Sequence, residues 1–314
     1  MLDPNHPVVD PEVSEAIVET TPEWIGILLV PVTYLGSVFI LLPLVIVAFW
    51  WNPERFGTWL PAFLAYYGIM GGIKSLNDAT RPDVEPPVEE SVFPGAYSEW
   101  VEHAVAIGTT SFPSGNAMVA ALIVALMVVD LRISTVRRRA IVGAFVIAVV
   151  GFTRLGLGVH YPVDVVVGIT LGIALLTLIL WLRGRVEDEV GATFAVALVS
   201  MAAGLWVING GLGVPTWGDL EGSLRVIAFG GAVGGLLGWR ATRLGWWRET
   251  PMALAALGVA FVATSLAELA LAHPLVTMVW AVATFALVTA IPGALPERNL
   301  ESTFDRVSAH EAQT

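Results

Sequence analysis

The sequence predicts an all-α fold, a polytopic transmembrane bundle of about nine helices. Composition is the first observation behind this prediction, since 56% of the 314 residues are hydrophobic and only 14% are charged. A soluble domain carries about 25% charged residues. The second observation is that the apolar residues form blocks, each close to the roughly 20 residues that a helix needs to cross a bilayer. We expect five of these helices to form a core and the last four to form a C-terminal extension.

The blocks also predict the domain organisation. Residues 1–24 are acidic and polar and lack the basic stretch of a standard signal peptide, with a short helix expected to begin at Pro11. We expect a membrane core over 25–185, additional transmembrane helices over 186–293 and a polar tail over 294–314. The nine blocks lie at about 25–49, 57–76, 114–131, 138–155, 162–182, 190–208, 223–240, 251–271 and 275–293.

Cation placement predicts the orientation of the bundle. When the chain is traced through nine crossings, twelve of the 16 cations fall on one side and the other four fall on the side of the N-terminus. Basic loops stay in the cytoplasm, so we expect the N-terminus to be extracytoplasmic and the tail to be cytoplasmic. The four outer cations are Lys74, Arg81, Arg154 and Arg225.

Three short polar clusters stand at the outer ends of the predicted helices. The first contains Lys74 and Arg81, the second is the run 113–116, and the third extends from Thr153 to Asp164. Together they bring three cations, a histidine and a carboxylate to the extracytoplasmic face, which is the composition of a phosphate site. Interfacial cations that extend toward water are the alternative for each cation taken alone.

Five residues are predicted to bind the phosphate group. Arg81 and Arg154 can each donate two parallel hydrogen bonds, and Lys74 supplies a compact charge. Ser114 and Gly115 are expected at a helix start, where free backbone N–H groups and the helix dipole favour an anion. An ordinary helix start is the alternative for this run on its own. Because three cations can take the place of a metal, we expect no metal and no cofactor.

His160 is the candidate nucleophile. Phosphoryl transfer to an imidazole nitrogen divides a hydrolysis into two easier steps. Asp164 follows four residues later, at the start of the next helix, and can accept the other ring N–H and stabilise the imidazolium that develops. A structural histidine near the membrane interface is the alternative.

The order and spacing of the clusters, Lys-x6-Arg-Pro, then Pro-Ser-Gly, then Thr-Arg-x5-His-x3-Asp, resemble the type 2 phosphatidic acid phosphatase superfamily. That superfamily also includes bacterial acid phosphatases and vanadium haloperoxidases. The resemblance covers roughly residues 50–185. It implies a membrane phosphatase that hydrolyses a lipid phosphate or a lipid (prenyl) diphosphate through a phosphohistidine, with His160 and Asp164 in the roles given above. A site at the bilayer suits a lipid headgroup better than haloperoxidase chemistry.

Two residues depart from the family pattern. Thr153 replaces a serine and keeps the hydroxyl. Asn116 replaces the histidine to which the family assigns protonation of the leaving-group oxygen, and an amide cannot transfer a proton near neutral pH. Losing a general acid costs about 10²–10⁴ in rate. A catalytically weak lipid-phosphate binding or transport protein is therefore the alternative function. Candidate substitutes for the acid lie in the outer loop: His103, Asp78, Glu89, Glu90 and Glu102.

The rest of the sequence limits the partners. It has no basic stripe for nucleic acid and no cysteine for disulfides, so the expected partners are the bilayer and a lipid substrate. A net charge of −11 with a single lysine is typical of a halophilic host, and an acidic tail in an ordinary organism is the alternative.

The region 190–293 shows no recognised chemistry. The glycines between Gly230 and Gly238 predict close helix packing, either beside the core or in a homo-oligomer contact. Glu268 is an ionisable residue inside a predicted span, which makes it a functional candidate. An interhelical hydrogen bond is its alternative role.

Overall fold

The computed structural model describes residues 11–77, 79–88, 96–105, 110–209, 220–244 and 274–294. Every regular element in these ranges is helical, which confirms the all-α prediction. The helix expected at Pro11 is present, and α1 begins at that residue. The elements are α1 (Pro11–Glu19), α2 (Glu23–Thr33), η1 (Tyr34–Gly36), α3 (Val38–Trp51), α4 (Pro53–Phe56), α5 (Trp59–Ser75), α6 (Ala96–Val105), α7 (Gly115–Asp130), α8 (Val136–Gly156), α9 (Pro162–Arg183), α10 (Glu189–Asn209), α11 (Leu220–Arg243) and α14 (Pro274–Ala294).

Several of these helices suit a bilayer. In the described part of the chain, four are long and apolar enough to cross a membrane, namely Glu23–Trp51, Val136–Gly156, Pro162–Arg183 and Glu189–Val207. Shorter apolar helices cover Gly115–Asp130 and Thr277–Ile291. Eight of the nine predicted blocks coincide with helices, and the block 251–271 lies outside the described residues. The protein is therefore a membrane protein built from several apolar helices.

The first predicted block, 25–49, is not one continuous helix. It divides into α2 and α3 at the 3₁₀ turn η1, after which Ser37 is extended, with φ −99° and ψ 157°. The turn lies against two other helices, because a Cβ on Gly36 would come within 2.7 Å of Val150 and 3.0 Å of the Asn116 carbonyl oxygen. Only a glycine allows this approach, which brings the end of α2 beside the outer ends of α7 and α8.

The predicted outer loop over 77–112 contains a helix, α6. Its side chains Val101 and Ala104 are buried and share an apolar cluster with Leu29 and Val30 of α2. The sequence analysis missed this helix because an apolar segment of ten residues is too short to read as a span. The packing gives α2 and the outer segment a common apolar core.

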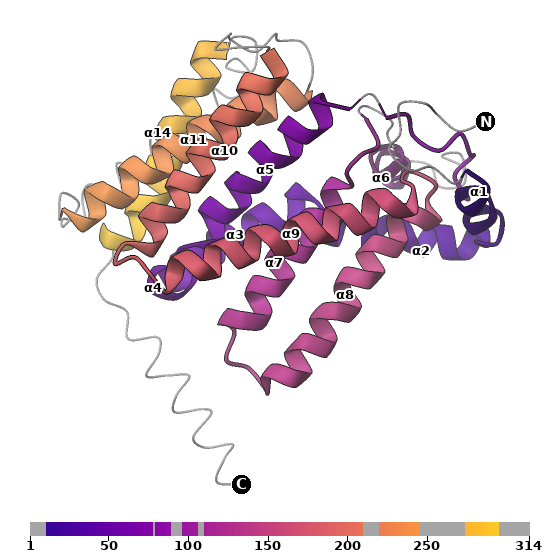
Figure 1. Ribbon diagram of the computed structural model, residues 1–314, viewed down its shortest axis with the longest axis horizontal. Helices are drawn as coiled ribbons and strands as arrows, with labels where there is room; N and C mark the ends of the chain where they lie inside the picture. Colours follow the sequence, from indigo (N-terminus) through magenta and orange to yellow (C-terminus); the bar gives the residue numbers. More distant parts are fainter. Residues whose placement is uncertain are drawn as a thin grey trace, which may run out of the picture.

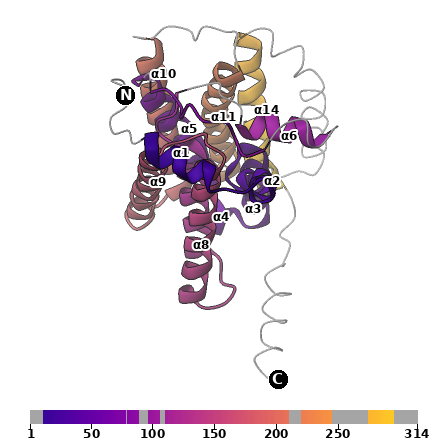
Figure 2. The same cartoon turned by 90° about the vertical axis from the view of Figure 1, so that its right-hand side faces the viewer.

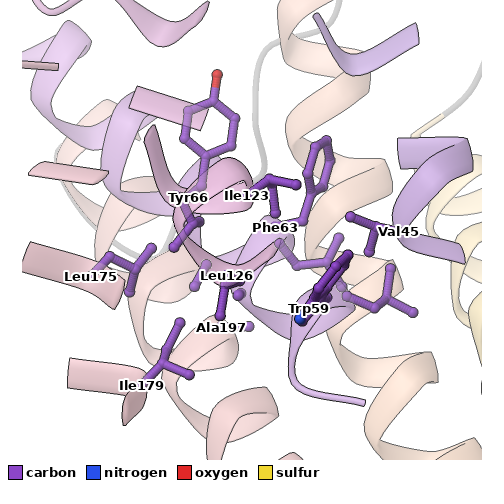
Figure 3. Packing of buried hydrophobic residues seen from close by; sticks show 14 of the residues in the cluster. Val45, Trp59, Phe63, Tyr66, Ile123, Leu126, Leu175, Ile179 and Ala197 are labelled. Atoms are coloured by element: carbon purple, nitrogen blue, oxygen red, sulfur yellow. The ribbon is translucent and has the colours of Figure 1, made fainter. Parts of the chain in front are cut away.

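Helix α5 forms the centre of the bundle (Figure 1). Helix α5 packs against α10 and α11 and also contacts α7 and α9. The perpendicular view shows α10 and α11 beside α5 (Figure 2). In the core between them, Trp59 and Phe63 of α5 lie among Leu126 of α7, Ile179 of α9 and Ala197 of α10 (Figure 3). Burial of these large side chains stabilises the arrangement of the helices that carry the polar clusters.

Helices α7 and α9 pack almost backbone to backbone. A Cβ on Gly168 would lie 2.5 Å from the Ser114 carbonyl oxygen, and one on Gly172 would lie 2.4 Å from that of Met118. Small residues permit such close helix contact. The start of α7 is thereby fixed against the first turns of α9, where Asp164 is located.

The predicted close packing of the glycine-rich region is confirmed. A Cβ on Gly234 would lie 2.0 Å from the Val282 carbonyl oxygen, and one on Gly238 would lie 2.1 Å from that of Ala286. These contacts join α11 to α14 along their length, and α11 also packs on α10. Glu268 lies outside the described residues, and a homo-oligomer contact stays a prediction.

A partly buried ion pair ties the helices together at the end opposite the polar clusters. Nη1 and Nη2 of Arg183 lie 2.7 Å and 2.9 Å from the two carboxylate oxygens of Asp130. Trp59 donates from Nε1 to the same carboxylate at 2.6 Å, and Arg183 donates from Nε to the Thr58 hydroxyl at 2.9 Å. The pair therefore links the last turns of α7 and α9 to the start of α5.

Candidate active site

The three polar clusters meet at one end of the bundle. Arg81 donates from Nη1 to the Val159 carbonyl at 2.7 Å, which joins the first cluster to the turn before α9. The backbone N–H of Ser114 donates to the Asp164 carbonyl at 3.0 Å, which joins the second cluster to the third. Segments separated by up to 79 residues in the sequence are thus in contact.

His160 and Asp164 form the centre of this assembly. Nδ1 of His160 lies 3.3 Å from Oδ2 of Asp164. The carboxylate oxygen is held from two further sides, because it accepts hydrogen bonds from the Tyr161 backbone N–H at 2.9 Å and from the Ser111 hydroxyl. The other ring nitrogen, Nε2, lies 3.4 Å from Nη1 of Arg81. One imidazole nitrogen thus faces a carboxylate and the other faces a cation.

The surroundings of His160 keep its ring neutral. Burial lowers the pKa of His160 from 6.5 to about 3, and the positive charges of Arg81 and Arg154 act in the same direction. The hydrogen bond to Asp164 acts against this and raises the pKa. Since burial is the largest cause, the imidazole is neutral at physiological pH, which is the protonation state that a nitrogen nucleophile needs.

Arg154 is held at one end of its guanidinium group. Nη1 donates to the Thr33 hydroxyl at 2.7 Å and to the Ala104 carbonyl at 3.2 Å. The adjacent Thr153 hydroxyl lies 3.0 Å from that of Thr33 and 2.7 Å from the Val150 carbonyl. Nε of Arg154 is buried and has no hydrogen-bond partner among the described residues. A buried guanidinium N–H without a partner is an unused donor.

The start of α7 provides a second unused group. Ser114 is the N-cap of α7 and is completely buried, yet no partner for its hydroxyl is found in the described part of the chain. Gly115 follows, and a Cβ there would lie 2.9 Å from the Tyr66 hydroxyl. The predicted helix start is therefore present, with a free hydroxyl beside it.

Lys74 lies at the end of α5 as predicted, and its side chain is buried. Its ammonium group donates to the Thr110 carbonyl, in the segment that leads to Ser111 and α7. Lys74 therefore bonds to the residue next to Ser111, whose hydroxyl donates to Asp164.

Asn116 lies in the first turn of α7 and is directed to the end of α2. Its Nδ2 donates to the Thr33 carbonyl at 3.4 Å. Both Asn116 and Arg154 thus bond to the same threonine, one through the backbone and the other through the side chain. The amide is a donor at this point and not a proton source.

The pattern of burial separates this end of the bundle from the rest. In the ranges that the structure describes, four Lys, Arg, His, Asp or Glu side chains are buried, and all four are predicted site residues: Lys74, Arg154, His160 and Asp164. Ionisable groups in a membrane protein interior are costly and mark functional sites. Arg81 is partly exposed beside them, so the cations outnumber the carboxylate.

Of the candidates for a replacement acid, only Glu102 is fully described by the structure. Glu102 is exposed on α6, whereas Asp78, Glu89 and Glu90 lie outside the described residues, as does the side chain of His103. The absence of a metal stays a prediction, although no group of three metal-ligating side chains occurs among the described residues.

Sequence reasoning missed three residues that contact the predicted ones. Ser111 had a local signal, because it lies three residues before Ser114 in the same polar run. Thr110 accepts from the Lys74 ammonium group through its backbone carbonyl, and its hydroxyl donates to the Lys74 carbonyl at 3.4 Å; an uncharged hydroxyl in the loop gave no indication of either contact. Thr33 lies in an apolar block more than 80 residues from its partners, and nothing in the sequence connects it with them.

Part of the chain is similar to known proteins. A family model described as the PAP2 superfamily matches residues 37–188. Phosphatidylglycerophosphatase B of Bacillus subtilis (strain 168) is 29% identical over 181 residues, which are 54% of this chain and 81% of the relative. The crystal structure of a transmembrane PAP2 type phosphatidylglycerolphosphate phosphatase from Bacillus subtilis matches 56% of this chain and 85% of its own, with 24% identity and a TM-score of 0.46.

The matched segment contains α3 to α9 and all eight predicted site residues. It also contains Thr153, which with Asn116 departs from the family pattern. Residues 37–188 are thus similar to the PAP2 superfamily, which is the family that the order and spacing of the polar clusters resemble.

Proposed function

We propose that the protein is a membrane phosphatase that hydrolyses a lipid phosphate or a lipid diphosphate, such as a prenyl diphosphate, through a phosphohistidine. The observation that carries the proposal is the burial of Lys74, Arg154, His160 and Asp164 at one end of the bundle. Lys74, Arg154 and the adjacent Arg81 carry more positive charge than the single carboxylate of Asp164 can neutralise. The negative charge of a phosphate group would balance this excess.

In this mechanism, the phosphate oxygens bind to Lys74, Arg81 and the Nε side of Arg154. The Ser114 hydroxyl and the N–H groups at the start of α7 complete the site. The two buried donors without partners, Arg154 Nε and Ser114 Oγ, support this assignment, because each would gain an acceptor. The fixed cations would also stabilise the charge that develops on the transferring phosphoryl group.

The chemical step begins with Nε2 of His160. Nδ1 is directed to Asp164, so Nε2 is the nitrogen available for attack. Nε2 donates its electron pair to phosphorus, the bond from phosphorus to the leaving oxygen breaks, and that oxygen takes the bonding pair. Water then attacks the phosphorus of the phosphohistidine, which releases inorganic phosphate and returns neutral His160. Asp164 stabilises the imidazolium character that develops between the two steps.

The lipid nature of the substrate rests on two supports. The site lies at one end of a bundle that includes helices long and apolar enough to cross a membrane, and lipid headgroups lie at the ends of such helices. The curated relative is a phosphatidylglycerophosphatase. Because most cations fall on the opposite side of the bundle, we propose that the site faces the extracytoplasmic side of the cell membrane. In this proposal, residues 25–185 are the catalytic core and residues 186–293 are additional membrane helices.

A second candidate function follows from Asn116. If no other group protonates the leaving oxygen, the protein binds or transports a lipid phosphate and turns it over weakly. The hydrogen bond from Asn116 to the Thr33 carbonyl favours this candidate, because the amide is used as a structural donor.

The deciding experiment measures phosphate release from a panel of lipid mono- and diphosphates by the purified protein, with and without a chelator. Arg81→Gln is compared with Arg185→Gln, because Arg185 is an exposed arginine whose guanidinium lies over Trp181. We expect release that the chelator does not reduce and that only Arg81→Gln abolishes. Binding of lipid phosphate without release would favour the second candidate, and absence of both would contradict the two together.

A further inference from the structure

The residue that holds Arg154 lies outside the segment that matches the family. Thr33 is the last residue of α2, and the matched segment begins at residue 37. The Thr33 side chain is only 2% exposed. Its hydroxyl oxygen accepts a hydrogen bond from Arg154 Nη1 at 2.7 Å. It also lies 3.0 Å from the Thr153 hydroxyl, whose own proton has the Val150 carbonyl at 2.7 Å as its nearest acceptor. Both contacts of the Thr33 hydroxyl are therefore with the third polar cluster.

These contacts determine which edge of the guanidinium remains available. Nη1 is held by Thr33 and by the Ala104 carbonyl, at 2.7 Å and 3.2 Å. Nε is buried and has no partner among the described residues. A guanidinium group binds phosphate best through two parallel N–H donors. With Nη1 anchored, the pair left for an anion is formed by Nε and Nη2.

The position of Thr33 is itself fixed by the fold. Helix α2 ends at this residue because the chain turns through η1, and Gly36 in that turn lies close to Val150 of α8. On the other side, a Cβ on Gly156 would lie 2.6 Å from Leu29 of α2. Helix α2 therefore packs tightly on the outer end of α8, on both sides of Arg154. The guanidinium is held from a rigid helix end.

We propose that Thr33 is a positioning residue, which holds Arg154 so that its Nε and Nη2 donors face the bound phosphate. The inference rests on the proposed function, since it concerns how that site binds its phosphate group. It assigns a part of the site to α2, which lies outside the segment matched by the family model.

The test compares Thr33→Val, which keeps the shape and removes the acceptor, with Thr33→Ser, which keeps the hydroxyl. Thr289→Val is the matched control, because Thr289 is 1% exposed and donates across a helix contact to the Gly235 carbonyl at 3.0 Å. The readouts are kcat and KM with the best lipid substrate, and the affinity for orthovanadate measured by the rise in unfolding temperature that it causes.

We expect Thr33→Val to weaken vanadate binding and lower kcat/KM, each by roughly 10- to 100-fold, as expected for loss of a hydrogen bond to a charged group. Thr33→Ser should stay within about threefold of the wild type. Thr289→Val can lower the unfolding temperature but should leave vanadate affinity unchanged. If Thr33→Val does not fold, Thr33→Ala removes the same acceptor with less bulk and is measured in its place.

A double-mutant cycle separates positioning from a general structural role. If Thr33 acts through Arg154, then Thr33→Val should cause little further loss of vanadate affinity in an Arg154→Gln background. Additive losses, or a Thr33→Val protein that binds vanadate as tightly as the wild type, would overturn the assignment of Thr33. If the wild type binds vanadate but releases no phosphate from any lipid, the proposed phosphatase activity is wrong. The assignment of Thr33 is then decided by the vanadate affinities of the variants alone.

Discussion

Oδ2 of Asp164 lies 3.3 Å from Nδ1 of His160 and also accepts the Tyr161 backbone N–H at 2.9 Å. Because Tyr161 is the N-cap of α9 and Asp164 lies in its first turn, the start of one helix fixes the carboxylate that orients the imidazole. The imidazole is therefore oriented by a carboxylate that the backbone at the start of α9 holds in place.

We expect His160→Ala to abolish turnover, because the variant lacks the nitrogen that attacks phosphorus. Affinity for inorganic phosphate should stay close to that of the wild type, since the three cations remain. Steady-state phosphate release and trapping of an acid-labile phosphoenzyme measure the two effects. His310→Ala, in the predicted tail, is the control. More than a few per cent of residual activity in His160→Ala would exclude a covalent phosphohistidine.

The protonation of His160 gives a prediction about pH. An ordinary histidine gains a proton as the pH falls through 6.5, whereas burial lowers the pKa of His160 to about 3. The folded protein should therefore keep a neutral His160 from pH 8 down to pH 5. Carbon-13 resonances of labelled histidine rings in the detergent-solubilised protein report this directly, and the resonance missing from His160→Ala identifies the residue. A midpoint near 6.5 for that resonance would show that the site does not keep the ring neutral.

Asn116 should favour substrates with good leaving groups. An alkoxide that leaves from a phosphate monoester needs a proton in the transition state, whereas a lipid monophosphate that leaves from a diphosphate needs it far less. We expect prenyl or diacylglycerol diphosphates to be hydrolysed much faster than phosphatidic acid. Asn116→His should raise monoester turnover by up to roughly 10²-fold and diphosphate turnover much less.

The role of residue 116 follows from comparing the gain in turnover that Asn116→His gives on the monoester with the gain on the diphosphate. Equal gains on both substrates would show that residue 116 acts through geometry, because Asn116 bonds to the Thr33 carbonyl. No gain on either substrate would indicate another acid, and His103→Ala is then the variant to measure.

The orientation of the bundle can be tested by labelling, because the chain has no cysteine of its own. Asp83→Cys, at an exposed position between α5 and α6, should react with an impermeant reagent in intact cells. Thr135→Cys, exposed in the turn before α8, should react only after the membrane is opened. The reverse pattern would place the candidate site on the cytoplasmic side.

The ion pair between Asp130 and Arg183 should stabilise the fold without a part in the chemistry. Asp130→Asn leaves Arg183 nearly buried without its counter-charge, and we expect a loss of about 3 kcal/mol in the free energy of unfolding. Phosphate release per folded molecule should not change, since the pair ties the opposite ends of α7 and α9. Asp188→Asn is the control, because its partner Arg240 is 62% exposed and such pairs contribute less than about 1 kcal/mol. Equal losses in the two variants would contradict the stabilising role.

The sequence by itself determined the helical class, the approximate limits of most helices and the residues of the candidate site. Apolar blocks of bilayer length can form little else than helices, because backbone polar groups need partners within the membrane. The residues Lys74, Arg81, Arg154 and His160 were predictable because charged and titratable groups are rare in such a chain.

The tertiary structure decided the contacts that surround those residues. Thr33 and Ser111 are uncharged, so no composition signal distinguishes them from the many hydroxyl groups that bond to their own helix. Their roles depend on the break at Gly36 and on the close approach of α7 to α9, which brings Ser114 to Asp164. Which edge of Arg154 remains free likewise depends on α2 and α6, two helices that the sequence pattern did not connect with it. Contacts between residues 50 to 120 positions apart arise only when the whole bundle packs, because local sequence carries no information about which helix ends meet.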